Sequence, residues 1–217
     1  MIAILDTGIG NLKSVYNAVY TLGYDPEFIT GDDIERLFNE ELDALCTHLI
    51  IPGVGAWEHA MEVERLGSLR DSVHRFADSG RPVLGICLGM QLLASRGEEG
   101  KSEGSTEGLG LIPGTVTRLL VDEQKLPLPH VGWNSVNRQR PHPILEGVES
   151  GIDCYFVHSY HFVCDAEEDL VATSDYGVPF TCIVGRGNVV GCQFHPEKSQ
   201  ANGLKMLENF CEWDGQC

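Results

Sequence analysis

Arg81-Pro82-Val83-Leu84-Gly85-Ile86-Cys87-Leu88-Gly89-Met90-Gln91-Leu92-Leu93 is the stretch that decides the fold. The apolar run 83–86 predicts a short buried strand, and residues 88–94 predict a helix that starts at once. Joining the two through Cys87 alone strains the backbone there, which is tolerated where neighbours two positions away lack side chains. Gly85 and Gly89 occupy those positions. The pattern is typical of a nucleophile elbow, which would hold the Cys87 thiol at the positive end of a helix dipole.

A second motif, His195-Pro196-Glu197, supplies the groups that a thiol nucleophile needs. In an extended segment, residues two apart face the same side, so Glu197 is expected to hold the His195 ring while that ring activates the thiol. Either motif alone has an ordinary structural explanation: a buried cysteine at a tight turn, or a turn that ends a strand. Taken together on one α/β chain, they predict a Cys-His-Glu triad.

A glycine-rich turn, Pro52-Gly53-Val54-Gly55, follows a predicted strand at 47–51. Glycines let a peptide plane turn its N–H inward, and attack on an acyl carbon requires donors for the developing oxyanion. We expect the segment Gly53, Val54 and Gly55 to supply one donor and the amide of Leu88 to supply the other. The alternative is a simple turn after a strand.

Composition narrows the class of protein. The chain has 217 residues, 42% of them hydrophobic, which suits one domain over 1–217 with a substantial core. No apolar run reaches the ~18 to 20 residues of a membrane span. The start of the chain predicts a core strand rather than a signal peptide, so we expect a cytoplasmic protein whose eight cysteines are reduced. A net charge of −17 argues against nucleic-acid binding.

The order of predicted elements favours an α/β fold: a three-layer arrangement with a largely parallel central sheet, helices on both faces and a β-rich second half. Strands are expected at 2–6, 27–30, 47–51 and 82–86, helices at 12–22, 32–38, within 56–79 and at 88–95, and a polar loop at 97–108. Short strands follow at 115–121, 130–137, 154–163, 169–174, 179–185 and 188–194, and a last helix at 202–213.

A dinucleotide-binding alternative arises at Asp6-Thr7-Gly8-Ile9-Gly10-Asn11, after the first strand. The third glycine of that fingerprint would fall at position 13, which is Lys13, and no phosphate-binding Gly-Lys-Ser/Thr follows. A tight strand-to-helix turn explains the segment better. No cofactor and no metal site is expected.

In their order and spacing, the motifs at 52–55, 85–91 and 195–197 resemble those of the class I (triad) glutamine amidotransferases. Other segments resemble, over essentially the whole chain, the family of glutaminase subunits of imidazole glycerol phosphate synthase, from histidine biosynthesis. The more specific of these are Pro129-His130-Val131-Gly132-Trp133-Asn134 and His195-Pro196-Glu197-Lys198-Ser199; the others are Gly8–Val15, Glu107–Gly114 and Tyr155–Tyr160.

The resemblance implies a reaction. Cys87 would attack the side-chain amide of glutamine and form a γ-glutamyl thioester, and His195 would protonate the departing ammonia and then activate water. Gln91 and the backbone near Ser159 and Tyr160 would hold the glutamine. Ammonia would pass through a tunnel to a separate (β/α)8-barrel cyclase subunit, which makes imidazole glycerol phosphate and the aminoimidazole carboxamide ribotide.

The resemblance also implies where that partner would bind. Asn11, Trp133, Asn134, Tyr155 and Lys198 would lie at the subunit interface and the tunnel entrance, and an aromatic residue suits such a surface. Core packing for Trp133 and simple solvation for Lys198 are the alternatives. The family usually has an aromatic residue where this chain has Thr7, which puts packing at that point of the interface in doubt.

Other functions stay open at this point. The chain resembles, less specifically, glutaminases of other amidotransferases such as pyridoxal phosphate synthase. A stand-alone cysteine hydrolase would use the same elbow without a partner, and an inactive scaffold would need no triad.

Overall fold

The computed structural model describes residues 1–6, 12–30, 46–57, 60, 64–100 and 104–217, without the side chains of 64–69. Its centre is a parallel sheet of five strands in the order β2-β1-β3-β4-β13. These strands are β1 (Ile2–Leu5), β2 (Pro26–Ile29), β3 (His48–Gly53), β4 (Val83–Cys87) and β13 (Val189–Cys192). This confirms the largely parallel central sheet predicted from the sequence.

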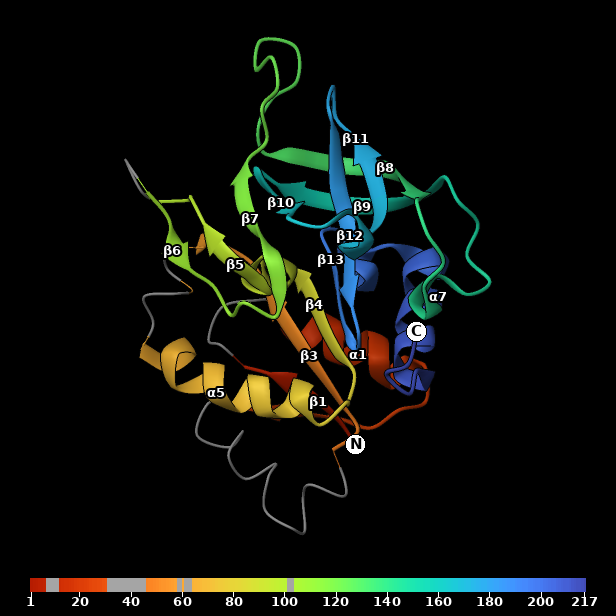
Figure 1. Ribbon diagram of the computed structural model, residues 1–217. Coiled ribbons are helices and arrows are strands. Elements are labelled where there is room, and N and C mark those ends of the chain that lie inside the picture. Colours follow the sequence, from red (N-terminus) through yellow and green to blue (C-terminus); the bar gives the residue numbers. More distant parts are fainter. Residues whose placement is uncertain (7–11, 31–45, 58–59, 61–63, 101–103) are drawn as a thin grey trace.

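Each buried strand of that sheet contributes side chains to a hydrophobic core on each face, because successive side chains point to opposite faces. Ile2 and Ile4 of β1 pack with α1 (Leu12–Thr21) and α7 (Gln200–Glu212) in one core. Ala3 and Leu5 pack with α5 (Glu64–Asp78) and α6 (Leu88–Leu92) in the other. Figure 1 shows α5 apart from α1 and α7, with the sheet between them. The three layers follow from this alternation.

The sheet continues beyond β13 into the second half of the chain. β12 (Pro179–Arg186), β10 (Tyr160–Cys164), β7 (Ile112–Arg118), β5 (Ala94–Gly97) and β6 (Thr106–Glu107) extend it, with antiparallel pairing from β13 to β7. β11 (Leu170–Asp175), β8 (His130–Arg138) and β9 (Ile152–His158) form a branch from β12. In Figure 1 this branch lies above the parallel strands. The β-rich second half is therefore joined to the central sheet rather than separate from it.

Three elements differ from the sequence prediction by more than shifts of a few residues at their ends. The elbow helix has five residues rather than eight, because Ala94–Gly97 leaves the helix to pair with β7. Thr106–Glu107, expected within a loop, pairs with β5. The single strand expected at 154–163 is two strands, β9 and β10, separated at Ser159. The helix expected at 32–38 lies outside the described residues.

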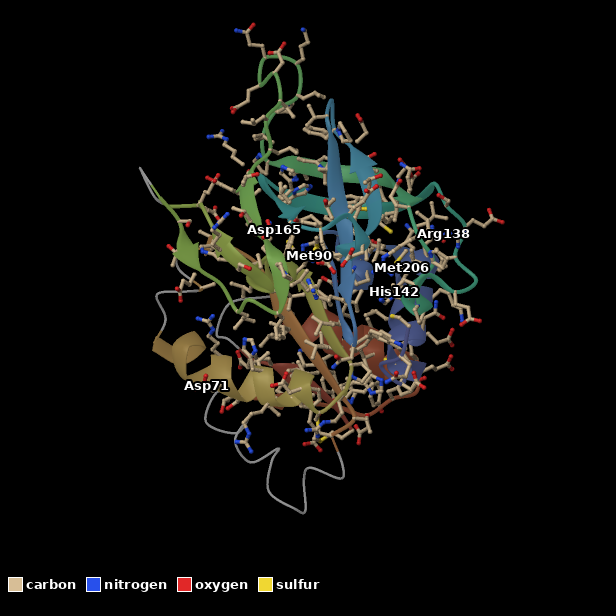
Figure 2. All side chains as sticks on the ribbon, viewed as in Figure 1. Asp71, Met90, Arg138, His142, Asp165 and Met206 are labelled. Carbon is tan, nitrogen blue, oxygen red and sulfur yellow. The ribbon has the colours of Figure 1, made fainter. Side chains whose placement is uncertain are left out.

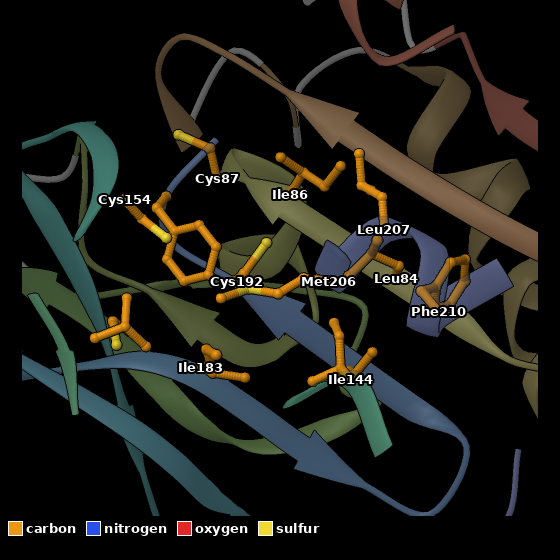
Figure 3. Packing of buried hydrophobic residues seen from close by; sticks show 14 of the residues in the cluster. Leu84, Ile86, Cys87, Ile144, Cys154, Ile183, Cys192, Met206, Leu207 and Phe210 are labelled. Carbon is orange, nitrogen blue, oxygen red and sulfur yellow. The ribbon is translucent and has the colours of Figure 1, made fainter. Parts of the chain in front are cut away.

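The core beside α7 reaches the carboxyl end of β4. Leu84 and Ile86 of β4 and Met206, Leu207 and Phe210 of α7 belong to one buried cluster, which Cys87 closes at its upper end (Figure 3). On the opposite face Met90 of α6 is fully buried, deep inside the molecule (Figure 2). The backbone that holds the Cys87 thiol is therefore packed on both faces of the sheet.

Candidate active site

The junction of β4 and α6 has the geometry of a nucleophile elbow. Cys87 adopts φ 54° and ψ −110°, a conformation that costs a residue with a side chain about 1–3 kcal/mol. A Cβ on Gly85 would lie 2.6 Å from the carbonyl oxygen of Gly89, and a Cβ on Gly89 would clash with the carbonyl oxygen of Ile51. The two glycines are required because backbone fills the space on both sides of the turn.

The strand order brings the other motifs to Cys87. Gly53 at the end of β3 pairs with Cys87 at the end of β4, and Cys192 at the end of β13 pairs with Ile86. Carboxyl ends of parallel strands lie at one edge of a sheet, where α/β proteins place their sites. Segments far apart in sequence therefore converge on one thiol.

His195 and Glu197 form a buried pair directly after β13. The Nδ1 atom of His195 lies 2.8 Å from Oε1 of Glu197, and the two side chains are 2% and 1% exposed. They face each other across a turn of 3-10 helix, η4 (Pro196–Lys198). The expected extended segment was wrong, although the pairing that it was meant to explain is present: the helical turn folds the carboxylate back onto the ring.

The electrostatics of this pair favour a protonated ring. Burial opposes the imidazolium, but the sulfur of Cys87 and the carboxylate of Glu197 outweigh it and raise the pKa of His195 to about 9. Nε2 of His195 is buried and has no hydrogen-bond partner among the described residues. That nitrogen is the one left over for chemistry with the thiol, since Nδ1 is held by Glu197.

Cys87 lines a pocket of about 220 Å³. Its wall includes Val54 and Gly55 from the glycine-rich turn, Leu88 and Gln91 from α6, and Ser159 and Tyr160 at the start of β10. Gly53 is set behind this wall, where a Cβ would lie 3.0 Å from Cβ of Leu88. Gly55 has φ 110°, which favours glycine. The structure thus brings the named oxyanion and substrate residues together around Cys87 except Gly53, which lies next to Leu88 but does not line the pocket.

The pocket also contains residues that the sequence analysis did not assign. Glu99 lines it, and Oε2 of Glu99 accepts a hydrogen bond of 2.7 Å from the backbone N–H of Trp57. Glu99 belongs to the segment predicted to be a featureless polar loop. Pro129, Val157 and His158 complete the wall. Pro129 and His158 belong to segments that resemble the glutaminase subunits, and this resemblance is the one sequence feature that could have indicated a role in the site.

Three of the predicted interface residues lie together. Trp133 of β8 pairs with Tyr155 of β9, their rings meet edge to face at 6.0 Å, and Trp133 is 48% exposed. The ammonium of exposed Lys198 lies 6.0 Å from the centre of the Tyr155 ring. Asn134 differs: its amide donates to the carbonyl of Asp175 at 2.7 Å, and its oxygen accepts from the N–H of Ser135. Asn11 lies outside the described residues.

Two other kinds of feature are absent from the part of the chain that the structure describes. No cluster of histidine, cysteine, aspartate or glutamate there is arranged to hold a metal ion. No helix there is long and apolar enough to cross a membrane.

Comparison with known proteins agrees with this geometry. A family model described as glutamine amidotransferase class-I matches residues 3–213, and the chain belongs to that family. Its fold is also that of a solved glutamine amidotransferase (TM-score 0.70, 20% identity, 97% of both chains) and of one from Thermotoga maritima (TM-score 0.62, 17% identity, 97% and 82% covered).

Two curated relatives identify the branch of the family. "Imidazole glycerol phosphate synthase subunit HisH" of Desulfitobacterium hafniense is 46% identical over 214 residues, 98% of this chain and 94% of the relative. "Imidazole glycerol phosphate synthase subunit HisH 2" of Nitrobacter winogradskyi is 43% identical over 216 residues, 98% of both. Within the class, the chain is a member of the glutaminase subunits of imidazole glycerol phosphate synthase, from histidine biosynthesis.

Proposed function

We propose that Cys87, His195 and Glu197 are the catalytic triad through which this subunit hydrolyses glutamine to glutamate and ammonia. The observation that carries the proposal is the strained elbow beside a buried His-Glu pair whose free nitrogen is left to serve the thiol.

The reaction follows from the protonation state of the pair. With a pKa raised to about 9, the His195 ring holds its proton at neutral pH and is able to give it to a leaving group. The attacking form of a cysteine is the thiolate. The sulfur bonds to the γ-amide carbon, the carbon–nitrogen bond breaks, and Nε2 gives its proton to the leaving nitrogen to form ammonia. Water then attacks the thioester, Nε2 takes a proton from that water, and the sulfur leaves as glutamate departs.

The amide of Leu88 and the segment Gly53, Val54 and Gly55 are proposed to stabilise the oxyanion of both tetrahedral intermediates. Loss of one such donor costs on the order of 100-fold in rate. If this segment turns a carbonyl inward in the isolated subunit, glutaminase activity is low until partner binding selects the flipped peptide.

Gln91, Ser159 and Tyr160 are proposed to bind glutamine, since all three line the pocket beside Cys87. Glu99 adds a carboxylate to the same wall, which suits the α-ammonium of an amino acid.

The proposed partner is a (β/α)8-barrel cyclase subunit that receives the ammonia through a tunnel. Trp133, Tyr155 and Lys198 support this interface, because an exposed tryptophan packed on a half-buried tyrosine, with an adjacent cation, suits a protein-binding surface. A cytoplasmic location belongs to the same proposal, since free cysteines such as Cys87 persist in a reducing compartment.

The test is glutamate release from glutamine by the chain alone and mixed with a cyclase subunit and its nucleotide ligand. We expect strong stimulation in the mixture and none with Cys87→Ala. High activity that is indifferent to the partner would establish a stand-alone hydrolase instead, and turnover by Cys87→Ala would exclude Cys87 as the nucleophile.

A further inference from the structure

A line of buried polar groups leads from β8 to the wall of the glutamine pocket. Nδ2 of Asn134 lies 3.4 Å from Nε2 of His130, and Nδ1 of His130 lies 3.0 Å from Nε2 of His158. Nδ1 of His158 lies 2.9 Å from the carbonyl oxygen of Tyr160. The two rings are 3% and 5% exposed, so each contact takes place away from bulk water.

The direction of these hydrogen bonds is fixed from both ends. The amide nitrogen of Asn134 only donates, so Nε2 of His130 accepts and Nδ1 of that ring carries its proton. Nε2 of His158 must then accept from His130, and Nδ1 of His158 donates to the carbonyl oxygen of Tyr160, which only accepts. Both rings are therefore neutral Nδ1–H tautomers, and a second proton on either would set one donor against another.

Packing holds the rings in this arrangement. His130 stacks on Tyr176 at 4.1 Å and on Phe156 at 5.2 Å. Burial lowers the pKa of His130 to about 4 and, as the largest influence, that of His158 to about 3. The neutral state that the hydrogen bonds require is also the state that the surroundings favour.

The line ends on an atom that also fixes Gln91. The carbonyl oxygen of Tyr160 accepts a second hydrogen bond, from Nε2 of Gln91 at 3.0 Å, and the same Nε2 donates to Oε1 of Gln193 at 3.1 Å. Both amide hydrogens of Gln91 are thus committed inside the protein. Gln91 belongs to the pocket wall beside Cys87, and its amide oxygen is the group that remains for a ligand.

We propose that His130 and His158 are positioning residues for glutamine binding: they fix the Tyr160 carbonyl, which in turn orients Gln91 so that it meets the substrate as an acceptor. This deepens the proposed glutaminase function and rests on it. The ligand group recognised by Gln91 is accordingly an N–H donor of the substrate, its amide or its α-ammonium, rather than its carboxylate.

Two substitutions at His158 each remove one of its two hydrogen bonds, to the carbonyl oxygen of Tyr160 or to His130. In His158→Asn the amide nitrogen occupies the place of Nδ1 and keeps the bond to Tyr160, but the link to His130 is lost. In His158→Gln the amide reaches the place of Nε2 and keeps the link to His130, but the bond to Tyr160 is lost. Tyr176→Phe, which keeps the ring against His130, is the matched control.

The experiment measures kcat and KM for glutamine with the cyclase subunit and its ligand present, together with thermal unfolding of each variant. Loss of one buried hydrogen bond corresponds to about a tenfold change in an equilibrium constant. We expect KM to rise about tenfold in His158→Gln with kcat within about threefold. In His158→Asn, which keeps the bond to Tyr160 but lacks the support of His130, we expect KM to rise only about threefold. Tyr176→Phe should leave KM unchanged. The positioning role would be overturned if KM rose equally in His158→Asn and His158→Gln and the rise paralleled the loss of thermal stability in each variant.

A spectroscopic measurement tests the tautomers without relying on activity. Nitrogen-15 chemical shifts of both rings should report Nδ1–H at pH 7, and an Nε2–H tautomer at either ring would overturn the inference. Failure of the proposed function is distinct: wild-type protein would release no glutamate, or Cys87→Ala would retain activity, whatever the tautomers are.

Discussion

Replacing His142 with asparagine should make the protein less sensitive to acid. His142 precedes the short helix η2 (Pro143–Leu145), which packs on α7 (Figure 2). Its Nδ1 accepts a hydrogen bond of 3.2 Å from the N–H of Ile144, and its ring meets Trp213 edge to face at 5.0 Å. A proton on Nδ1 would face another donor, and burial, aided by Arg140, lowers the pKa of the ring to about 4.

The size of the effect follows from the thermodynamic linkage between proton binding and folding. A histidine whose folded pKa lies below its unfolded value of about 6.5 contributes stability above that pH, and the contribution is lost as pH falls toward the folded pKa. With a folded pKa of about 4, His142 binds about one more proton in the unfolded chain at pH 5. The free energy of unfolding therefore falls by about 2 kcal/mol at this ring between pH 8 and pH 5.

The assay is urea denaturation of wild type and His142→Asn at pH 8 and pH 5. Asparagine keeps an oxygen acceptor for the N–H of Ile144 and does not titrate. Any loss of unfolding free energy from its poorer packing is therefore the same at both pH values. Between pH 8 and pH 5, the difference in free energy of unfolding between the two proteins should change by about 2 kcal/mol in favour of the variant. Leu145→Val, a nearby core change, should show no such shift. An equal difference at both pH values for His142→Asn would refute the reasoning.

Four further predictions concern the site. Cys87→Ala should lower the pKa of His195 from about 9, which NMR titration of the ring would detect; a pKa still near 9 would show that the sulfur has no part in it. Gly85→Ala should cost about 2–3 kcal/mol in denaturant unfolding, since its Cβ would meet backbone at 2.6 Å; an unchanged midpoint would contradict this. Glu99→Gln should raise KM for glutamine about tenfold with kcat retained, and an unchanged KM would exclude an ammonium contact. Trp133→Ala should weaken cyclase binding by about 2 kcal/mol in calorimetry while glutamate release by the isolated subunit stays the same.

The elbow could be predicted from the sequence because its signal is local. Gly85 and Gly89 flank Cys87 at spacings that a strand-to-helix turn requires, and the neighbouring apolar runs identify both elements. The parallel sheet could be predicted for a related reason, since strands buried on both faces are apolar throughout.

What could not be predicted depends on contacts between distant segments. The five-residue length of α6 is set by pairing of Ala94–Gly97 with β7, which no pattern in the elbow itself records. Glu99 lines the pocket because its loop folds back to the N–H of Trp57. The amide of Asn134, a residue that stays a predicted interface residue, is also bonded to Asp175 and Ser135, and the contact with Asp175 has no signal in the neighbouring sequence.

The parallel alignment of β3, β4 and β13 has a consequence for how the protein is made. The strand that carries the thiol is synthesised well before the strand that leads to His195 and Glu197, and domains form as the chain leaves the ribosome. Until β13 inserts beside β4, His195 and Glu197 are not held next to Cys87. The proposed triad is thus completed last, with the closing of the sheet, so an unfinished chain carries the elbow cysteine without its histidine and glutamate.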